Sequence, residues 1–148
     1  MQKTMFEILL IEDNPFEAEL AIRSLKKYNL ANHLVHIDDG AEALDFIFSR
    51  GKYKTQSLEA NPKLILLDIK LPKVDGIEVL RQIKANESTK LIPVVMLTSS
   101  KENIDIKTCY DLGANSYIVK PVNFDSFAKA VADLGLYWMV LNNSPEKK

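Results

Sequence analysis

The chain has 148 residues, of which 47% are hydrophobic and 26% are charged, and its formal net charge is −1. This length predicts one globular domain with a buried core, and the charge argues against nucleic acid or an anionic membrane surface as a partner. Because there is no signal peptide, no apolar run near the roughly 20 residues of a membrane span and a single cysteine, Cys109, we expect a cytoplasmic protein.

Short apolar runs and segments of helical periodicity alternate along the chain. The apolar runs predict five strands, in order at residues 6–11, 33–37, 64–67, 93–97 and 116–119. The segments between and after them predict five helices, at residues 15–28, 41–49, 76–86, 102–112 and from 123 or 124 to 141. Asn14 and Pro15 suit the start of the first helix, and Gly113 suits the end of the fourth.

Two segments lie outside this alternation. Residues 50–62 are polar and longer than the roughly 4–6 residues of a typical connection, which predicts a surface loop that could in part extend the second helix. Residues 142–148 are polar and contain Pro145, which predicts a flexible C-terminal tail. We therefore expect one domain over residues 1–141, with no output domain.

The alternation of strands and helices predicts an α/β fold with a parallel sheet, helices on both faces and right-handed crossovers. Five strands at this spacing favour a doubly wound sheet in the order 2-1-3-4-5, which is the flavodoxin-like arrangement. The third strand is a continuous apolar run between Pro62 and Pro72, which is typical of a strand buried on both faces. It leads to Asp68 at the carboxyl edge of the sheet, where such folds bind their ligands.

Polar side chains follow four of the predicted strands at this edge: Glu12 and Asp13 after the first, Asp68 after the third, Thr98 after the fourth and Lys120 after the fifth. In the order 2-1-3-4-5 the first and third strands are neighbours, so Asp13 and Asp68 should face each other. Three carboxylates together repel, and this repulsion raises their pKa values. A hard divalent cation relieves it. We infer that Asp13 and Asp68 ligate Mg²⁺, or Mn²⁺ in its place, and that Glu12 holds a water.

A carboxylate can also attack phosphorus and form an aspartyl phosphate, and the central mount of Asp68 makes it the better nucleophile. Lys120 would then pair with the transferred phosphoryl group, and the Thr98 hydroxyl would hydrogen-bond to it. Each residue alone has an ordinary explanation, as a turn or helix cap for Asp68 and Thr98 and as a solvated surface charge for Lys120. The hypothesis depends on their falling together at neighbouring strand ends.

Four short motifs at these strand ends together resemble the receiver domain of two-component response regulators. They are Glu12-Asp13-Asn14, Asp68 with Leu71-Pro72 and Asp75-Gly76, Thr98-Ser99, and Lys120-Pro121. The resemblance covers residues 6–141 and implies that Asp68 accepts a phosphoryl group from a sensor histidine kinase. Such a protein catalyses its own phosphorylation and dephosphorylation and is not a turnover enzyme.

The resemblance also implies how the metal is held and how hydrolysis is tuned. It assigns the metal to Asp13 and Asp68, with Glu12 in support and the main-chain oxygen of Lys70 as a further ligand. Lys70 and Ser100 lie two residues beyond Asp68 and Thr98, at positions that border the path of the hydrolytic water in the family. We therefore expect their side chains to tune dephosphorylation.

A second group of implied roles concerns the phosphoryl group and the switch. Thr98 and Lys120 are expected to bind the phosphoryl group, and the peptide bond between Lys120 and Pro121 is expected to be cis. In the family, phosphorylation draws the threonine hydroxyl toward the phosphoryl group and turns an aromatic ring of the fifth strand inward. That ring is Tyr117 here, although the sequence alone favours a half-buried strand aromatic.

The polar segment 50–62 and the aromatic C-terminal helix are most similar to the phytochrome-associated single-domain regulators. The expected partners are a sensor kinase, which could be of the phytochrome type, and a histidine phosphotransfer protein or other downstream protein. The apolar run over residues 136–141 exceeds the single stripe that an outer helix needs. We expect either a homodimer through the fourth helix, fifth strand and fifth helix, with Tyr137 and Trp138 near its centre, or a fold of this end onto the domain's own core.

Three other functions are compatible with parts of the pattern. A haloacid dehalogenase also forms an aspartyl phosphate, but it needs a second aspartate two residues after the nucleophile, where this chain has Lys70. A flavodoxin-like FMN site needs backbone donors after the first strand, where this chain is acidic. A receiver-like protein-binding module that is never phosphorylated remains the alternative, because intact site residues do not prove that they are used.

Overall fold

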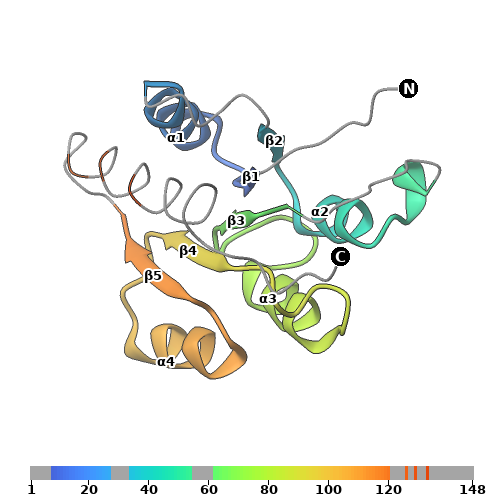
Figure 1. Cartoon of the computed structure of the whole chain (residues 1–148). Coiled ribbons are helices and arrows are strands. Elements are labelled where there is room, and N and C mark those ends of the chain that lie inside the picture. Colours follow the sequence, from blue (N-terminus) through green and yellow to red (C-terminus); the bar gives the residue numbers. More distant parts are fainter. Residues whose placement is uncertain are drawn as a thin grey trace.

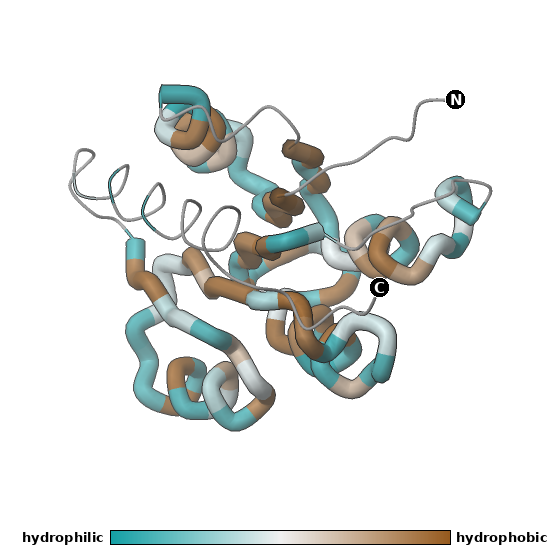
Figure 2. Tube along the Cα trace, viewed as in Figure 1, coloured by the Kyte–Doolittle hydropathy of each residue, from teal (hydrophilic) through white to brown (hydrophobic). Residues whose placement is uncertain are grey.

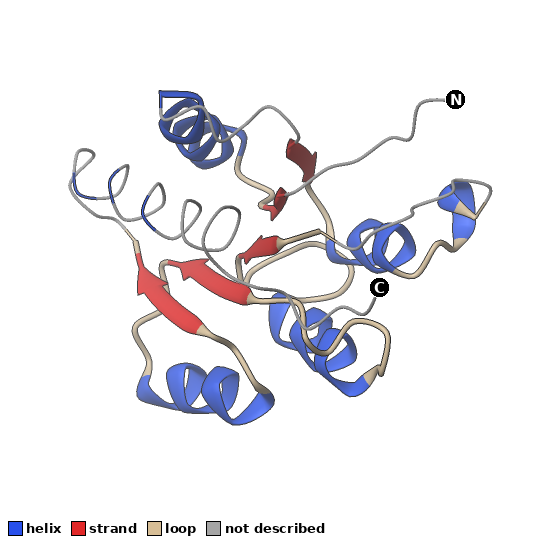
Figure 3. Cartoon of the chain, viewed as in Figure 1, coloured by secondary structure: helices blue, strands red, loops and turns tan. Residues whose placement is uncertain are grey.

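Five parallel strands form one sheet in the computed structural model, which describes residues 8–27, 34–54 and 62–120 together with residues 126, 129 and 133. The strands are β1 (Ile8–Ile11), β2 (Leu34–Ile37), β3 (Leu64–Leu67), β4 (Val94–Thr98) and β5 (Ser116–Val119). Their order in the sheet is β2-β1-β3-β4-β5 (Figure 3), which confirms the predicted doubly wound arrangement.

The helices cover both faces of this sheet. They are α1 (Pro15–Lys27), α2 (Gly40–Ile47), α3 (Gly76–Ala85) and α4 (Asn103–Leu112), with a short 3₁₀-helix, η1 (Gly51–Tyr53). Figure 1 shows α1 on one face and α2, α3 and α4 on the other. Over the described ranges, no helix is both long and apolar enough to cross a bilayer.

Alternate residues of the central strands enter two separate hydrophobic clusters. Ile8 and Leu10 of β1 pack with the buried side of α1, whereas Leu9 and Ile11 pack with residues of α2 and α3. All residues of β1 and β3 are buried, as expected for strands covered on both faces. Hydrophobic colour accordingly follows the strands in Figure 2, while hydrophilic and hydrophobic residues alternate along the helices.

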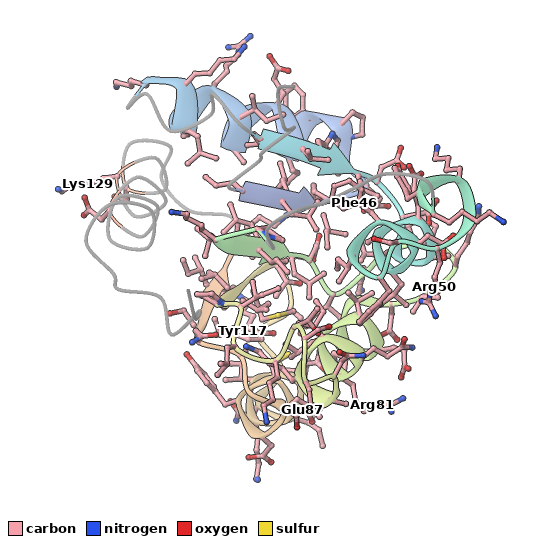
Figure 4. The ribbon with its side chains drawn as sticks, turned by 45° about the vertical axis from the view of Figure 1, so that its right-hand side comes forward. Phe46, Arg50, Arg81, Glu87, Tyr117 and Lys129 are labelled. Atoms are coloured by element: carbon pink, nitrogen blue, oxygen red, sulfur yellow. The ribbon has the colours of Figure 1, made fainter. Side chains whose placement is uncertain are left out.

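The segment after α2 differs from the predicted surface loop, because residues 51–53 form η1. The ring of Tyr53 packs edge-on against Phe46, with 5.0 Å between the ring centroids, and its hydroxyl donates to the carboxylate of Glu42. Phe46, labelled in Figure 4, is itself buried in the core under α2. This aromatic contact anchors a segment whose polar composition predicted a loop.

The predicted bounds of β3 and β5 are confirmed, and the described ends of the other elements lie within two residues of prediction. The clearest difference is in β4, which begins at Val94 and includes Thr98 because the amide of Lys120 donates to the Thr98 carbonyl oxygen at 2.7 Å. The predicted last helix and the tail at residues 142–148 lie outside the described residues, apart from the helical residues 126, 129 and 133.

Lys84, in the last turn of α3, occupies a partly buried junction between α3, the connection to β4 and the end of α4. Its ammonium donates to the carbonyl oxygens of Lys90 at 3.0 Å and Ile92 at 2.6 Å. Its stem lies against Gly113, which has φ 111° and ends α4. Burial lowers the pKa of Lys84 to about 8.

We expect Lys84 to make the free energy of unfolding rise with pH between about 8 and 10.5. Above pH 8 the folded chain releases a proton that the unfolded chain still binds, so deprotonation favours the folded state. Urea titrations of the parent and of Lys84→Met across this range would measure the effect. The parent should gain stability relative to the variant as the pH rises, and a difference between the two that does not change with pH would contradict the expectation.

Candidate functional site

The ends of the central strands are fixed to one another by backbone hydrogen bonds. The amide of Asp68 donates to the carbonyl oxygen of Ile11 at 3.1 Å, and the amide of Lys120 donates to that of Thr98 at 2.7 Å. These bonds continue the sheet ladder just past β3 and β5. The side chains of Asp68 and Lys120 therefore project from backbone positions that the sheet holds in place.

Glu12, Asp13 and Asp68 form an acidic cluster in which a carboxylate oxygen of each lies within 4.8 Å of those of the others. Glu12 and Asp68 are buried, whereas Asp13 is exposed. Burial raises the pKa of Glu12; the hydrogen bond from Lys120 opposes this effect, and the charge of Asp68 adds to it. The structure thus brings the three carboxylates together at the edge where the strand order predicts them.

Lys120 is the cation of this cluster and is buried. Its Nζ lies 2.8 Å from Oε1 of Glu12, 2.9 Å from Oε1 of Glu17 and 3.5 Å from Oδ2 of Asp68. Burial alone would lower the pKa of Lys120, but the hydrogen bonds to Glu12 and Glu17 and the charge of Asp68 outweigh it, so the pKa is raised. Lys120 is therefore charged at neutral pH, and it is not a solvated surface lysine.

The carboxylate of Asp68 is oriented by the backbone that follows it. The amide of Ile69 donates to Oδ1 at 2.7 Å, while Oδ2 faces Lys120. The start of α3 packs directly against this turn, since a Cβ at Gly76 would lie 1.9 Å from the carbonyl oxygen of Asp68. Only glycine fits at residue 76, and this close approach sets the start of α3 against the backbone of Asp68 and Ile69.

Glu12 is held by the start of α1 and by β2. Its Oε2 accepts from the amide of Asn14 at 3.1 Å, and its carbonyl oxygen lies 2.8 Å from Nε2 of His36. Asn14 caps α1 as the sequence predicts, because its Oδ1 accepts from the amides of Phe16 at 2.9 Å and Glu17 at 3.0 Å. The first turn of α1 is thereby fixed beside the cluster.

The residues predicted to act as the switch lie in one hydrogen-bonded path. Thr98 is fully buried, and its Oγ1 accepts from the amide of Ser100 at 3.4 Å. The hydroxyl of Tyr117, which is labelled in Figure 4, donates to the carbonyl oxygen of Ser100 at 2.9 Å. The hydroxyl of Ser100 donates to Asp105 of α4 at 2.6 Å. The β4–α4 connection is therefore tied to β5 and to α4.

The donor set of the cluster fits a small divalent cation. It offers carboxylate oxygens alone, which Mg²⁺ and Mn²⁺ prefer, and the exposure of Asp13 leaves access for water ligands. The side chain of Lys70 is exposed, and the assignment of its main-chain oxygen as a ligand stays a prediction.

A second acidic group, Asp38, Asp39 and Glu42, has similar spacing but no buried member. Asp39 caps α2 by accepting from the amide of Glu42 at 2.6 Å, and its other oxygen lies 3.8 Å from Nζ of Lys73. The capping bond and the ion pair give this group a structural explanation. We therefore place the candidate metal centre at Glu12, Asp13 and Asp68.

Sequence reasoning missed Glu17 as a member of the site. The available signal was its position in the first turn of a helix that begins beside Asp13, which places it at the same edge of the sheet. An acidic residue in a first turn is already explained by the helix dipole, and no local pattern indicates that Glu17 pairs with Lys120, which is far away in the sequence.

Several predictions concern residues outside the described ranges. They are the cis peptide bond before Pro121 and the interface positions Tyr137 and Trp138. These stay predictions.

Comparison with known proteins gives one family over most of the chain. The model of the response regulator receiver domain matches residues 8–132. The chain is 38% identical over 140 residues to the probable methanogenesis regulatory protein FilR2 of Methanothrix harundinacea, which covers 95% of this chain and 88% of that protein. It is also 38% identical over 132 residues to the response regulator Rcp1 of Synechocystis, which covers 89% of this chain and 88% of that protein.

Solved structures extend this likeness to three dimensions. The phosphorylated cyanobacterial phytochrome response regulator RcpA superposes with a TM-score of 0.84 at 35% identity, covering 96% of this chain and 99% of that one. The Mn²⁺-bound form of Rcp1 superposes with a TM-score of 0.83 at 36% identity, covering 95% of this chain and 99% of that one. Both have the same fold over nearly their whole length.

Asp13→Asn should weaken Mn²⁺ binding by roughly 10–100-fold, because it removes a charged oxygen ligand while preserving the size of the side chain. Titration followed by the electron paramagnetic resonance of free Mn²⁺ would measure the affinity. Asp38→Asn in the second acidic group is the matched control and should bind like the parent. The reverse pattern would move the metal site to the β2–α2 connection.

Proposed function

The chain belongs to the response regulator receiver family of two-component signalling proteins, and we propose from this that Asp68 is the residue that accepts the phosphoryl group. The observation that carries the proposal is the buried contact between Lys120 and the carboxylates of Asp68 and Glu12. A cation held there can stabilise the charge of an incoming phosphoryl group. Its donor is proposed to be the phosphohistidine of a sensor kinase.

The proposed transfer begins with Oδ2 of Asp68, the oxygen that faces Lys120. Because Oδ1 is held by the amide of Ile69, Oδ2 forms the new bond to phosphorus as the phosphorus–nitrogen bond breaks, and the electron pair leaves with the histidine ring. Lys120 and the Thr98 hydroxyl donate to the phosphoryl oxygens. A divalent cation, when bound by the acidic cluster, neutralises part of the charge on those oxygens.

We propose that the same residues catalyse hydrolysis of the aspartyl phosphate, which makes the chain a switch and not an enzyme that turns over a separate substrate. The exposed side chain of Lys70 and the position of Ser100 beside Thr98 support a role in controlling water access. A switch of this kind acts where a kinase presents its phosphohistidine, and we place it in the cytoplasm.

A kinase of the phytochrome type is the proposed partner, because the chain is similar to RcpA, which is described as a phytochrome response regulator. We propose that the downstream partner is a histidine phosphotransfer protein or another protein that binds the face of α4 and β5. The exposed side chains of Ile104 and Tyr110, at 72% and 48%, give α4 an apolar surface for such contacts.

The same surface supports the proposal of a homodimer through α4, β5 and the segment that contains Tyr137 and Trp138. Two copies that bury exposed apolar side chains against each other gain stability in proportion to the area removed from water. Of the two exposed residues described on α4, Ile104 has the larger exposed fraction, and we use it to test the contact.

Incubation with acetyl phosphate and Mg²⁺ should add one phosphoryl group to the parent chain, measured as intact mass. Asp68→Asn should add none, and neither should the parent without metal. Asp75→Asn is the matched control, because Asp75 lies in the same connection, caps α3 through a bond that asparagine preserves, and should leave phosphorylation unchanged. No adduct on the parent under any condition would favour the alternative of an unphosphorylated protein-binding module.

Sedimentation velocity at high micromolar concentration, with and without acetyl phosphate, should show a dimer of the parent. Ile104→Asp should shift the distribution toward monomer, because it places a charge in the apolar contact. Phe16→Asp is a control, since Phe16 is exposed at 77% but belongs to α1, which covers the opposite face of the sheet from α4. A parent that sediments as a monomer in both states would contradict the dimer.

A further inference from the structure

The ammonium of Lys120 contacts three carboxylates that differ in their exposure to water. Its two shortest contacts are with Glu12 at 2.8 Å and Glu17 at 2.9 Å, while Asp68 lies at 3.5 Å. The side chain of Glu12 is 5% exposed and that of Asp68 11%, but that of Glu17 is 38% exposed. Glu17 is therefore the solvent-accessible partner of a buried cation.

The position of Glu17 is set by the helix that carries it. Its amide donates to the capping oxygen of Asn14 at 3.0 Å, which fixes the first turn of α1 and directs this turn toward the strand ends. Within the described residues, Lys120 is the cation that the structure pairs with Glu17. Glu19, two residues on, instead pairs with Arg23 on the exposed face of the same helix, at 3.0 Å.

An ammonium has three N–H donors, and in this structure the two shortest contacts take two of them. A phosphoryl group on Asp68 brings nearly two negative charges and three strong acceptor oxygens, so it can accept more than the one remaining donor and competes with the two glutamates for Lys120. Release of Glu12 would leave a buried carboxylate without its cation, which is strongly unfavourable. Release of Glu17 leaves a carboxylate that water can solvate, because its side chain is 38% exposed, and exposure of one partner weakens an ion pair.

We propose that Glu17 is a positioning residue that holds Lys120 when Asp68 is unmodified and competes with the phosphoryl group for it. This inference rests on the function proposed for Asp68 and Lys120. Glu12 stays paired with Lys120 in both states, and Glu17 is the partner that exchanges. Glu17 therefore lowers the affinity of the site for a phosphoryl group and shifts the equilibrium toward the unmodified chain.

Beryllofluoride, which mimics a phosphoryl group on aspartate, tests this competition by equilibrium binding in the presence of Mg²⁺. Glu17→Gln should bind it about two- to fivefold more tightly than the parent, which is the fold-change expected from the loss of one partly exposed ion pair. Glu17→Asp, which keeps the charge, should return the affinity toward that of the parent. Glu19→Gln, which removes the same charge from the same helix away from Lys120, should match the parent.

A gain in affinity separates this role from a structural one, because damage to α1 would weaken binding and lower the midpoint of thermal unfolding. If the parent does not bind beryllofluoride, the function proposed for Asp68 is wrong whatever the variants do. If the parent binds and Glu17→Gln binds equally or more weakly, the role of Glu17 alone is wrong. Equal gains in Glu17→Gln and Glu19→Gln would also overturn it, because a general charge effect would then explain both.

Discussion

The candidate site depends on one buried cation among acidic groups. Glu12, Asp13 and Asp68 would repel one another at the ends of adjacent strands, and burial of two of them makes this repulsion stronger. Lys120 offsets it from β5, on the opposite side of β3 from β1. The site can therefore attract ions of both signs. The carboxylates that Lys120 does not neutralise attract a small cation, and the ammonium of Lys120 attracts an anion. A site of this composition suits a metal and a phosphoryl group together.

The register of the sheet brings these residues together. Close backbone approaches at Gly76, described above, and at Gly40 fix the connections around them. Ile11 of β1 pairs with Leu67 of β3, so Glu12 and Asp68 leave the sheet at the same level. Beyond the strands, a Cβ at Gly40 would lie 1.7 Å from the carbonyl oxygen of Val74. The start of α2 is thus packed against the β3–α3 connection, and glycine at residue 40 is required by space alone.

The parts of this arrangement that the sequence predicts are those set by local pattern and strand order. The continuous apolar run of β3 and the polar residue after each strand are enough to place Asp68, Thr98 and Lys120 at one edge. The rest depends on contacts between distant residues. The 3₁₀-helix at residues 51–53 is stabilised because the ring of Tyr53 packs against that of Phe46. No pattern within a polar segment predicts such a contact. The pairing of Glu17 with Lys120 has the same origin.

The hydrogen bonds beyond the acidic cluster show how a change at the site can reach the surface. The Thr98 hydroxyl accepts from the amide of Ser100, and the carbonyl oxygen of that same residue accepts from Tyr117. A Thr98 hydroxyl that moved to donate to a phosphoryl oxygen would leave the Ser100 amide without this acceptor. Because a partly buried amide without a partner is unfavourable, the β4–α4 connection would have to rearrange, and with it the bonds that Ser100 makes to Tyr117 and Asp105. In the proposed switch, a phosphoryl group on Asp68 would thus be coupled to the surface of α4 and β5 through one residue, Ser100.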